Sequence, residues 1–191
     1  VSLNRFSGMF AFALWDIRDK ILTLARDRIG EKPLYYGWQG NSFLFGSELK
    51  ALRVHPAWKG KIQRNAITLF LKFNYIPAPY SIYQDIFKLP PGTLIKIPYG
   101  MPSGQLPKPK VYWSIKHTAL KGHNNPLILS DKETVDYMET ILKKAVKNMM
   151  ITDVPLGAFL SGGIDSSLVV ALMQQMSTSR VRTFSIGFFE K

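Results

Sequence analysis

The residues best suited to chemistry lie in one short stretch, residues 160–167, whose sequence is LSGGIDSS. Adjacent glycines let a backbone approach a ligand closely, because they carry no side chain. If a helix begins directly after them, its free N–H groups and its dipole favour an anion. Serine hydroxyls supply further donors to phosphate oxygens. The stretch therefore predicts a phosphate-binding loop.

Asp165 is the acidic residue of this stretch. A carboxylate beside a bound phosphate can hold a magnesium ion, which screens the phosphate charge. The alternative is an ordinary strand-to-helix turn, in which Asp165 or Ser166 caps the helix. The strands expected before and after the loop favour the phosphate-binding interpretation. The sequence has neither GxxxxGK[ST] nor GxGxxG, so a different nucleotide chemistry is predicted.

The elements that must position this loop follow from the surrounding pattern. Residues 154–160 form a short, nearly all-apolar run, which is typical of a strand buried on both faces in a parallel sheet. Residues 168–176 predict a helix, and residues 181–189 predict a second buried strand. This order is the βαβ arrangement of an α/β sheet.

A long helix is predicted before the loop. Ser130 and Glu133 have the spacing of a capping box, in which each side chain bonds to the other residue's free backbone N–H. Seven apolar residues then recur at helical spacing and predict one buried stripe. They are Val135, Met138, Ile141, Leu142, Ala145, Val146 and Met149.

The first half of the chain predicts antiparallel β structure. Strands are expected at 10–17, 20–26, 33–38, 42–46 and 93–97, and a short helix at 64–73. Prolines and glycines crowd residues 98–109, and residues 116–129 are polar and loop-like. We therefore predict a domain boundary near residue 115, with domains at 1–115 and 116–191.

Composition limits the class of protein. The chain has 191 residues, 46% of them hydrophobic, which is enough apolar material for a core. Its longest apolar run, residues 9–15, is far shorter than the roughly 20 residues that cross a bilayer. There is no cysteine, which excludes a disulfide, a Cys-ligated zinc site, an iron–sulfur cluster and a thiol nucleophile from this stretch. We expect no membrane partner and a reducing, cytoplasmic location.

The net charge of +12 suits a nucleic-acid partner at first sight. The 25 lysines and arginines are spread along the chain, however, and do not form a tail. Their densest clusters, at 59–64 and 108–110, do not alternate with aromatic residues as in single-strand binders. Nucleic-acid binding is therefore disfavoured.

The motif SGGxDSS, complete at 161–167, resembles the signature of the N-type ATP pyrophosphatase family. The resemblance implies that the loop grips the pyrophosphate of ATP while a carboxyl or carbonyl oxygen attacks the α-phosphorus. It implies ATP as the nucleotide, with adenosine contacts at Leu160 and Ile186. The Mg²⁺ predicted above from the loop's own residues would be held by Asp165. The implied ATP-binding residues are Leu160, Ser161, Gly162, Gly163, Asp165, Ser166, Ser167 and Ile186.

Three blocks in the first half resemble the C-terminal part of a class II glutamine amidotransferase domain. They are SGMFAFALW at 7–15, ARDRIGEKPLYY at 25–36 and SELKAL at 47–52. Taken singly, Arg26, Asp27, Lys32 and Glu48 are typical of ion pairs and turns. Taken together in this order along the chain, and followed by SGGIDSS, the blocks resemble the glutamine-hydrolysing asparagine synthetase family. The resemblance covers nearly the whole chain.

This resemblance implies an α+β, antiparallel-sheet glutaminase of the Ntn type, followed by the start of an α/β parallel-sheet ATP pyrophosphatase domain. The chain is then an internal fragment of a ligase whose substrates are ATP, glutamine and aspartate or another carboxylate. The family's cysteine nucleophile is absent from this chain, so we expect the fragment alone to be inactive. A homodimeric parent protein is compatible with the resemblance.

Three alternatives stay open. One is an amidotransferase of the same family that acts on a sugar acid or a peptide carboxylate. Another is a tRNA-modifying ATP pyrophosphatase, which the charge would suit but which needs no glutaminase half. The third is a non-catalytic module derived from the enzyme.

Overall fold

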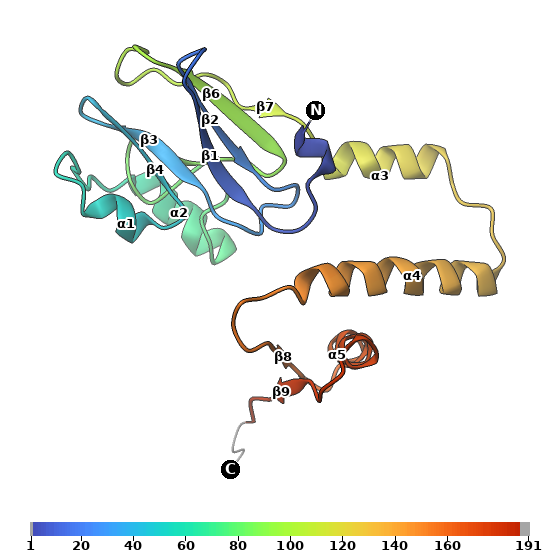
Figure 1. Cartoon of the computed structure of the whole chain (residues 1–191). Helices are drawn as coiled ribbons and strands as arrows, with labels where there is room; N and C mark the ends of the chain where they lie inside the picture. The colour runs from blue at the N-terminus through green and yellow to red at the C-terminus, as the bar shows by residue number, and fades with distance from the viewer. Residues whose placement is uncertain (1, 188–191) are drawn as a thin grey trace. The chain divides into compact units, whose positions relative to one another are not determined.

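The structure is a computed structural model and describes residues 2–187. The chain divides into two compact units, one that runs to Asn125 and one that starts at Pro126 (Figure 1). The boundary predicted near residue 115 coincides with the first residue of helix α3 (Ile115–Asn124). A division into domains at that residue stays a prediction.

The first unit contains two antiparallel sheets, as the sequence predicts (Figure 1). One has the strand order β1-β2-β6-β7 and the other β4-β3-β5. The predicted hairpins are confirmed, since β1 pairs with β2 and β3 pairs with β4. The strands are β1 (Ala11–Asp16), β2 (Ile21–Arg26), β3 (Tyr35–Gln39), β4 (Ser42–Gly46), β5 (Ile86–Lys88), β6 (Thr93–Pro98) and β7 (Lys110–Val111).

The helices of the first unit are short. They are the 3₁₀ helix η1 (Ser2–Arg5) and the α-helices α1 (Leu49–Arg53), α2 (Arg64–Phe73) and α3. The prediction for α2 is confirmed, whereas the loop predicted over 116–129 is wrong because α3 occupies most of it. The side chain of Ser114 caps α3 by accepting from the N–H of His117 at 3.3 Å. No residue of α3 is buried.

The main core lies between the two sheets. Alternate residues of β6 point inward, because successive strand side chains face opposite sides. Six buried residues form this cluster, namely Leu24, Leu34, Tyr36, Leu89, Ile95 and Ile97. Burial raises the pKa of Tyr36 to about 12, as expected for a phenol kept away from water.

A second cluster covers the opposite face of the smaller sheet. Leu44 of β4 and Ile86 of β5 pack there with Leu52 of α1. The smaller sheet is therefore buried on both faces.

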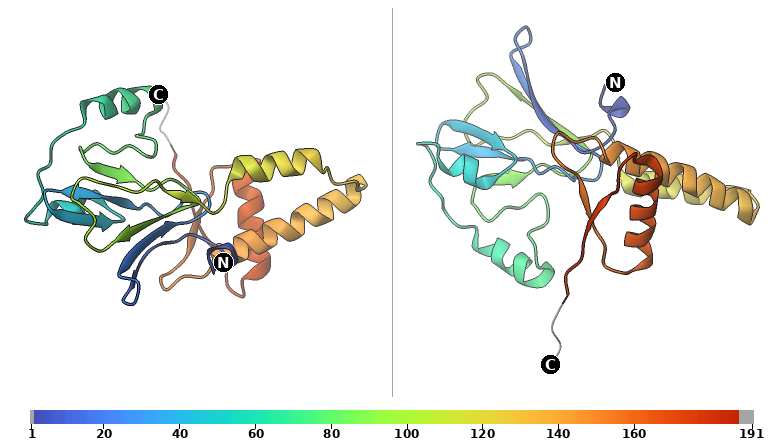
Figure 2. Two further views of the ribbon diagram at one scale, coloured as in Figure 1. Left: turned by 90° about the horizontal axis from the view of Figure 1, so that it is seen from above. Right: turned by 60° about the horizontal axis from the view of Figure 1, so that its bottom comes forward.

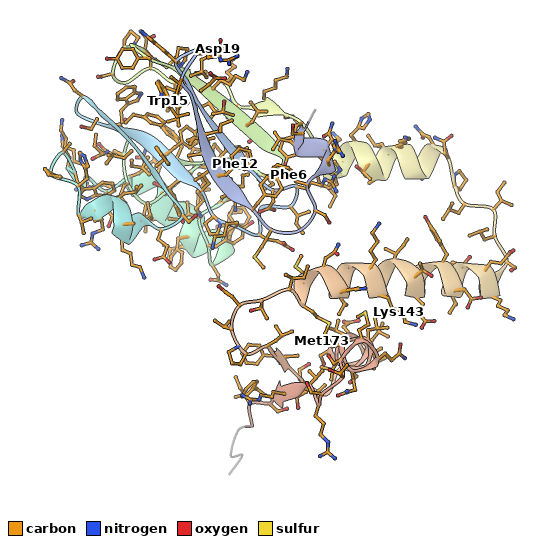
Figure 3. All side chains as sticks on the ribbon, viewed as in Figure 1. Phe6, Phe12, Trp15, Asp19, Lys143 and Met173 are labelled. Atoms are coloured by element: carbon orange, nitrogen blue, oxygen red, sulfur yellow. The ribbon has the colours of Figure 1, made fainter. Side chains whose placement is uncertain are left out.

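Near the start of β1, the rings of Phe6 and Phe12 lie edge to face with centroids 6.0 Å apart (Figure 3).

The carboxylate of Asp27, which directly follows β2, is buried and accepts four backbone N–H groups. Its Oδ1 accepts from Gly30 at 2.6 Å and from Glu31 at 2.9 Å. Its Oδ2 accepts from Lys32 at 2.9 Å and from Phe10 at 3.3 Å. One side chain thus holds the turn after β2 against the segment that leads into β1.

The neighbouring Arg26 bonds to backbone carbonyls in the same region. Its guanidinium donates to the carbonyls of Lys32 at 2.8 Å, Gly30 at 2.6 Å and Leu89 at 2.7 Å. The hydroxyl of Tyr112 donates to the carbonyl of Arg26 at 2.7 Å. Burial lowers the pKa of Arg26. We call the bonds of Arg26 and Asp27 together the Arg26–Asp27 network.

The second unit contains α4 (Asp131–Met149), β8 (Gly157–Phe159), α5 (Ile164–Met176) and β9 (Arg182–Phe184). The strands β8 and β9 pair in parallel, with Phe159 opposite Phe184. The chain leaves β8, runs through α5 and returns to β9 (Figures 1 and 2). The predicted βαβ order is confirmed over these residues.

Burial in the second unit differs from the prediction. Gly157, Phe159 and every residue of β9 are exposed, so neither strand is buried on both faces. The capping box of Ser130 and Glu133 is confirmed, but no residue of α4 is buried. The reason is that, among residues 126–187, α4 packs mainly on α5, which leaves Val135 64% exposed. Lys143, labelled with Met173 in Figure 3, forms an ion pair with Glu139 at 2.6 Å along α4.

No helix among residues 2–187 has both the length and the apolar character that crossing a membrane requires.

Replacing Asp27 by Ala should strongly destabilise the first unit. Four backbone N–H groups in part-buried bonds would lose their acceptor, and an unpaired donor that water cannot reach costs about 1–3 kcal/mol. We expect a loss of more than about 3 kcal/mol in the free energy of unfolding by urea. Tryptophan fluorescence is the measurement, because all four tryptophans, Trp15, Trp38, Trp58 and Trp113, lie in the first unit. The matched control Asp19→Ala changes an exposed aspartate, and equal losses in both variants would contradict the expectation.

Glu133 should titrate below the ordinary range of a glutamate. Hydrogen bonds from the side chain of Ser130 at 2.7 Å and from its backbone N–H at 2.9 Å lower the pKa of Glu133. Because the folded pKa is lowered, the stabilisation is present above the ordinary value and is lost as pH falls through the lowered one. NMR titration of the Glu133 carboxyl measures this, and Ser130→Ala should return the pKa toward its ordinary value. Thr140→Ala, on the same helix, should leave it unchanged, and a matching shift there would refute the assignment.

Candidate functional site

The predicted phosphate-binding loop connects β8 to α5. Leu160 follows the last residue of β8, and Gly163 is the N-cap of α5. The N–H of Leu160 donates to the carbonyl of Phe184 at 2.9 Å. The hydroxyl of Ser185 donates to the carbonyl of Leu160 at 2.6 Å. The start of the loop is therefore bonded to the chain that leaves β9.

The two glycines of the loop have different conformations. Gly162 has φ +82°, in the left-handed region that favours glycine, and a Cβ there would meet nothing within 4 Å. Gly163 has φ −77° and ψ 161°, which other residues also adopt. Gly162 is therefore required for its conformation, whereas Gly163 leaves the helix start without a side-chain cap.

The start of α5 has the features of an anion site. The first N–H groups of a helix have no acceptor within the helix, and its dipole places partial positive charge there. The first turn of α5 closes with the N–H of Ser167 donating to the carbonyl of Gly163 at 3.1 Å. The N–H groups of the preceding residues 164–166 are the ones that an anion would meet.

Two of the predicted serines bond to each other. The hydroxyl of Ser166 donates to the carbonyl of Gly163 at 3.1 Å and accepts from the N–H of Ser161 at 3.3 Å. The two hydroxyl oxygens of Ser161 and Ser166 lie 3.0 Å apart. The hydroxyl of Ser167 has no hydrogen bond to any residue in 2–187, so it is available as a donor.

Asp165 lies in the first turn of α5 and is exposed. Its carboxylate has no hydrogen bond or ion pair with any described residue. It is not the N-cap, because Gly163 has that position. Within residues 2–187 no group of three or more His, Cys, Asp or Glu side chains is arranged to hold a metal. Any metal at Asp165 would therefore take most of its ligands from elsewhere.

The two positions assigned to adenosine lie at the ends of the paired strands. Leu160 is half-buried after β8, and Ile186 is 77% exposed two residues after β9 ends. Because β8 and β9 are parallel and paired, both positions follow the same end of the strand pair. The structure brings the eight predicted residues to this end of the second unit.

Comparison with known proteins finds a match for each part of the chain. Residues 1–113 match the glutamine amidotransferase domain family, and residues 138–191 match asparagine synthase. The chain belongs to the glutamine amidotransferase domain family. The resemblance to glutamine-hydrolysing asparagine synthetases is confirmed, and the amidotransferase match covers all three blocks identified in the sequence.

Relatives of this chain match it almost from end to end. A Methanocaldococcus jannaschii protein, provisionally named glutamine-hydrolysing asparagine synthetase 2, is 37% identical over 189 residues, 97% of this chain and 35% of the relative. Glutamine-hydrolysing asparagine synthetase 3 of Bacillus subtilis is 31% identical over 98% of this chain and 30% of its own length. Amidase chyE of Penicillium rubens is 29% identical over 91% of this chain and 24% of its own length. The chain thus spans about a third of the length of the synthetases.

The charged residues of the amidotransferase blocks make hydrogen bonds and an ion pair within the first unit. Arg26 and Asp27 form the buried network described above, which confirms the expected turn chemistry but not an ion pair between them. Glu48, the N-cap of α1, pairs with Lys50 of the same helix at 2.7 Å on the surface. These residues support the fold of the first unit.

Sequence reasoning missed Ser185. It lies directly before Ile186 and bonds to Leu160, but a serine at the end of a strand carries no motif of its own. Only the pairing of β8 with β9 identifies its partner.

The difference between the two glycines is testable. In Gly162→Ala the added Cβ disfavours the left-handed backbone by roughly 1–2 kcal/mol, although there is space for it. In Gly163→Ala the backbone is unstrained, and the new Cβ would lie 3.6 Å from the Ser161 hydroxyl. We expect faster amide hydrogen exchange over 161–167 in the first variant only. The same exchange rates in both variants would show that the conformation of Gly162 does not matter.

Proposed function

We propose that the protein containing this chain is an ATP-dependent, glutamine-hydrolysing amide ligase that converts aspartate to asparagine. The supporting observation is one chain in which an amidotransferase match is followed by an SGGIDSS loop, between β8 and α5, inside a match to asparagine synthase. Each half supplies one part of such a reaction. The amidotransferase half provides ammonia from glutamine, and the second half activates the acceptor.

The proposed activation consumes ATP. A β-carboxylate oxygen of aspartate attacks the α-phosphorus, the bond to the β-phosphate oxygen breaks, and pyrophosphate leaves. Ammonia then attacks the carbonyl carbon of the resulting β-aspartyl-AMP, and AMP leaves as asparagine forms. This chain contains no cysteine, so we assign glutamine hydrolysis to the whole protein and expect none from these 191 residues alone.

In this proposal the loop binds the pyrophosphate part of ATP. The N–H groups at the start of α5 and the hydroxyl of Ser167 donate to phosphate oxygens. Ser161 and Ser166 shape the loop through their mutual bond and line the same anion. Leu160 and Ile186 contact the adenosine, which suits their apolar side chains.

Asp165 is the residue we propose to hold Mg²⁺. The donor set fits, since Mg²⁺ commonly takes one or two carboxylates and completes its shell with phosphate oxygens and water. The Asp165 carboxylate is unpaired among residues 2–187 and exposed at the anion-binding end of α5. A carboxylate at that position would repel phosphate unless a cation stood between them. Once bound, the ion would neutralise phosphate charge.

A second acceptor class is retained because two relatives are named amidases and not asparagine synthetases. The acceptor would then be a sugar acid or a peptide carboxylate, activated by the same loop. A tRNA-modifying pyrophosphatase is disfavoured, since such an enzyme has no use for the amidotransferase match over residues 1–113.

The test is product analysis with the full-length protein. With glutamine, ATP and Mg²⁺, we expect AMP, pyrophosphate and asparagine to form only when aspartate is added. AMP formation with a sugar acid or peptide carboxylate, but not with aspartate, would replace the substrate assignment. Hydrolysis of glutamine without AMP under every acceptor would reject the ligase.

Asp165→Asn in the full-length protein tests the metal role. If Asp165 holds Mg²⁺, turnover should fall on the order of a hundredfold, which corresponds to ~2.7 kcal/mol of transition-state stabilisation. The thermal melt should hardly change, because Asp165 is exposed and unpaired among the described residues. Steady-state AMP formation across a magnesium titration is the measurement.

Asp136→Asn is the matched control, an exposed aspartate of the same unit on α4. It should leave AMP formation within a few fold. Normal turnover of Asp165→Asn at unchanged stability would remove Asp165 from the metal site.

A further inference from the structure

We propose that Ser185 is a positioning residue that fixes the adenosine side of the ATP site through the carbonyl of Leu160. This inference rests on the proposed function, because it concerns the same nucleotide. The bond that carries it runs from the Ser185 hydroxyl to the Leu160 carbonyl at 2.6 Å. The N–H of Leu160 meanwhile donates to the carbonyl of Phe184 at 2.9 Å. Both backbone polar groups of Leu160 are thus bonded to consecutive residues of one segment.

The hydroxyl of Ser185 takes the place of a backbone bond. The pairing of β8 with β9 ends at Phe159 and Phe184. In a continued parallel ladder, the Leu160 carbonyl would accept from the N–H of Ile186, two residues after Phe184. Here its donor is the Ser185 side chain. The backbone at Ile186 is thereby released from the ladder while Leu160 stays attached.

The Ser185 bond sets how far apart the chain lies at Leu160 and at Ile186, beyond the last paired residues of β8 and β9. Leu160 leads into the glycine loop, and Ile186 leaves with its side chain 77% exposed. A nucleoside between them needs a fixed gap bounded by apolar side chains. Ser185, adjacent to Ile186 in sequence and bonded to Leu160, couples the positions of both.

The role is positioning and not direct contact. A hydroxyl can donate one hydrogen bond, and the Ser185 hydroxyl donates it to the carbonyl of Leu160. Loss of the hydroxyl should therefore loosen the space for the nucleoside between Leu160 and Ile186. The loop that would bind phosphate, residues 161–167, is held by its own hydrogen bonds and should be less affected. Nucleoside affinity should fall more than phosphate affinity.

The experiment uses the full-length protein with Ser185→Thr and Ser185→Val. These side chains have nearly the same shape and suit a strand end, but only Thr keeps the hydroxyl. In Ser185→Val we expect KM for ATP to rise about tenfold, with kcat within about twofold. The inhibition constant of adenosine should rise similarly, and that of pyrophosphate should stay within about twofold. Ser185→Thr should behave as wild type.

Ser179→Ala is the control, an exposed serine of the same unit that lies outside the site. It should change none of these constants. An unchanged KM for ATP in Ser185→Val would overturn the proposal. Equal losses of affinity for adenosine and pyrophosphate would also overturn it, since they would indicate general loosening of the loop. A KM for ATP in Ser185→Thr that rises as it does in Ser185→Val would overturn it as well.

The two proposals can fail separately. If the wild-type protein forms no AMP with any carboxylate, the proposed function is wrong. Adenosine binding to wild type, Ser185→Val and Ser185→Thr, measured by calorimetry, would still decide the role of Ser185. Equal affinities in the three proteins would reject it.

Discussion

The first unit depends on one buried acceptor, the carboxylate of Asp27. Burying a carboxylate is costly unless its lone pairs are satisfied, and four backbone N–H groups satisfy them here. Its partners include Phe10, 17 residues earlier. The neighbouring Arg26 extends the same network to Leu89, 63 residues later, and Tyr112 reaches it from 86 residues later. Segments that belong to different hairpins therefore meet around two consecutive residues.

This network also explains what the sequence revealed of the first unit. The hairpins and α2 were predictable because their apolar periodicity and turn residues act locally. The roles of Arg26 and Asp27 were only partly predictable, since ion pairs and turns are the usual use of such residues and most of their partners here are backbone groups. A sequence shows a side chain's donors and acceptors but not which distant carbonyl reaches them. The elements α1, β5 and β7 were missed because a few residues cannot display a period.

In the second unit, the sequence indicated which residues form the site better than it indicated their burial. Residues 160–167 were found from glycine, serine and aspartate at a recognisable spacing, and they form the turn after β8 and the first turn of α5. The apolar stripe of α4 and the apolar runs of β8 and β9 predicted burial that residues 126–187 do not provide. Periodicity identifies the face that a helix would bury, but burial also needs a partner on that face. The split between Gly162, which needs positive φ, and Gly163, which does not, requires backbone angles that no spacing rule contains.

The electrostatics of the loop link the anion site to the cation. Residues 148–179 contain no lysine or arginine, although the whole chain carries a net charge of +12. The start of α5 contributes about half a positive charge, and Asp165 in the same turn carries a full negative one. These two contributions do not attract a polyphosphate on their own, because the carboxylate outweighs the helix end. We infer that phosphate binding at this loop requires a bound cation, so the assignments of the glycine loop to pyrophosphate and of Asp165 to Mg²⁺ depend on each other.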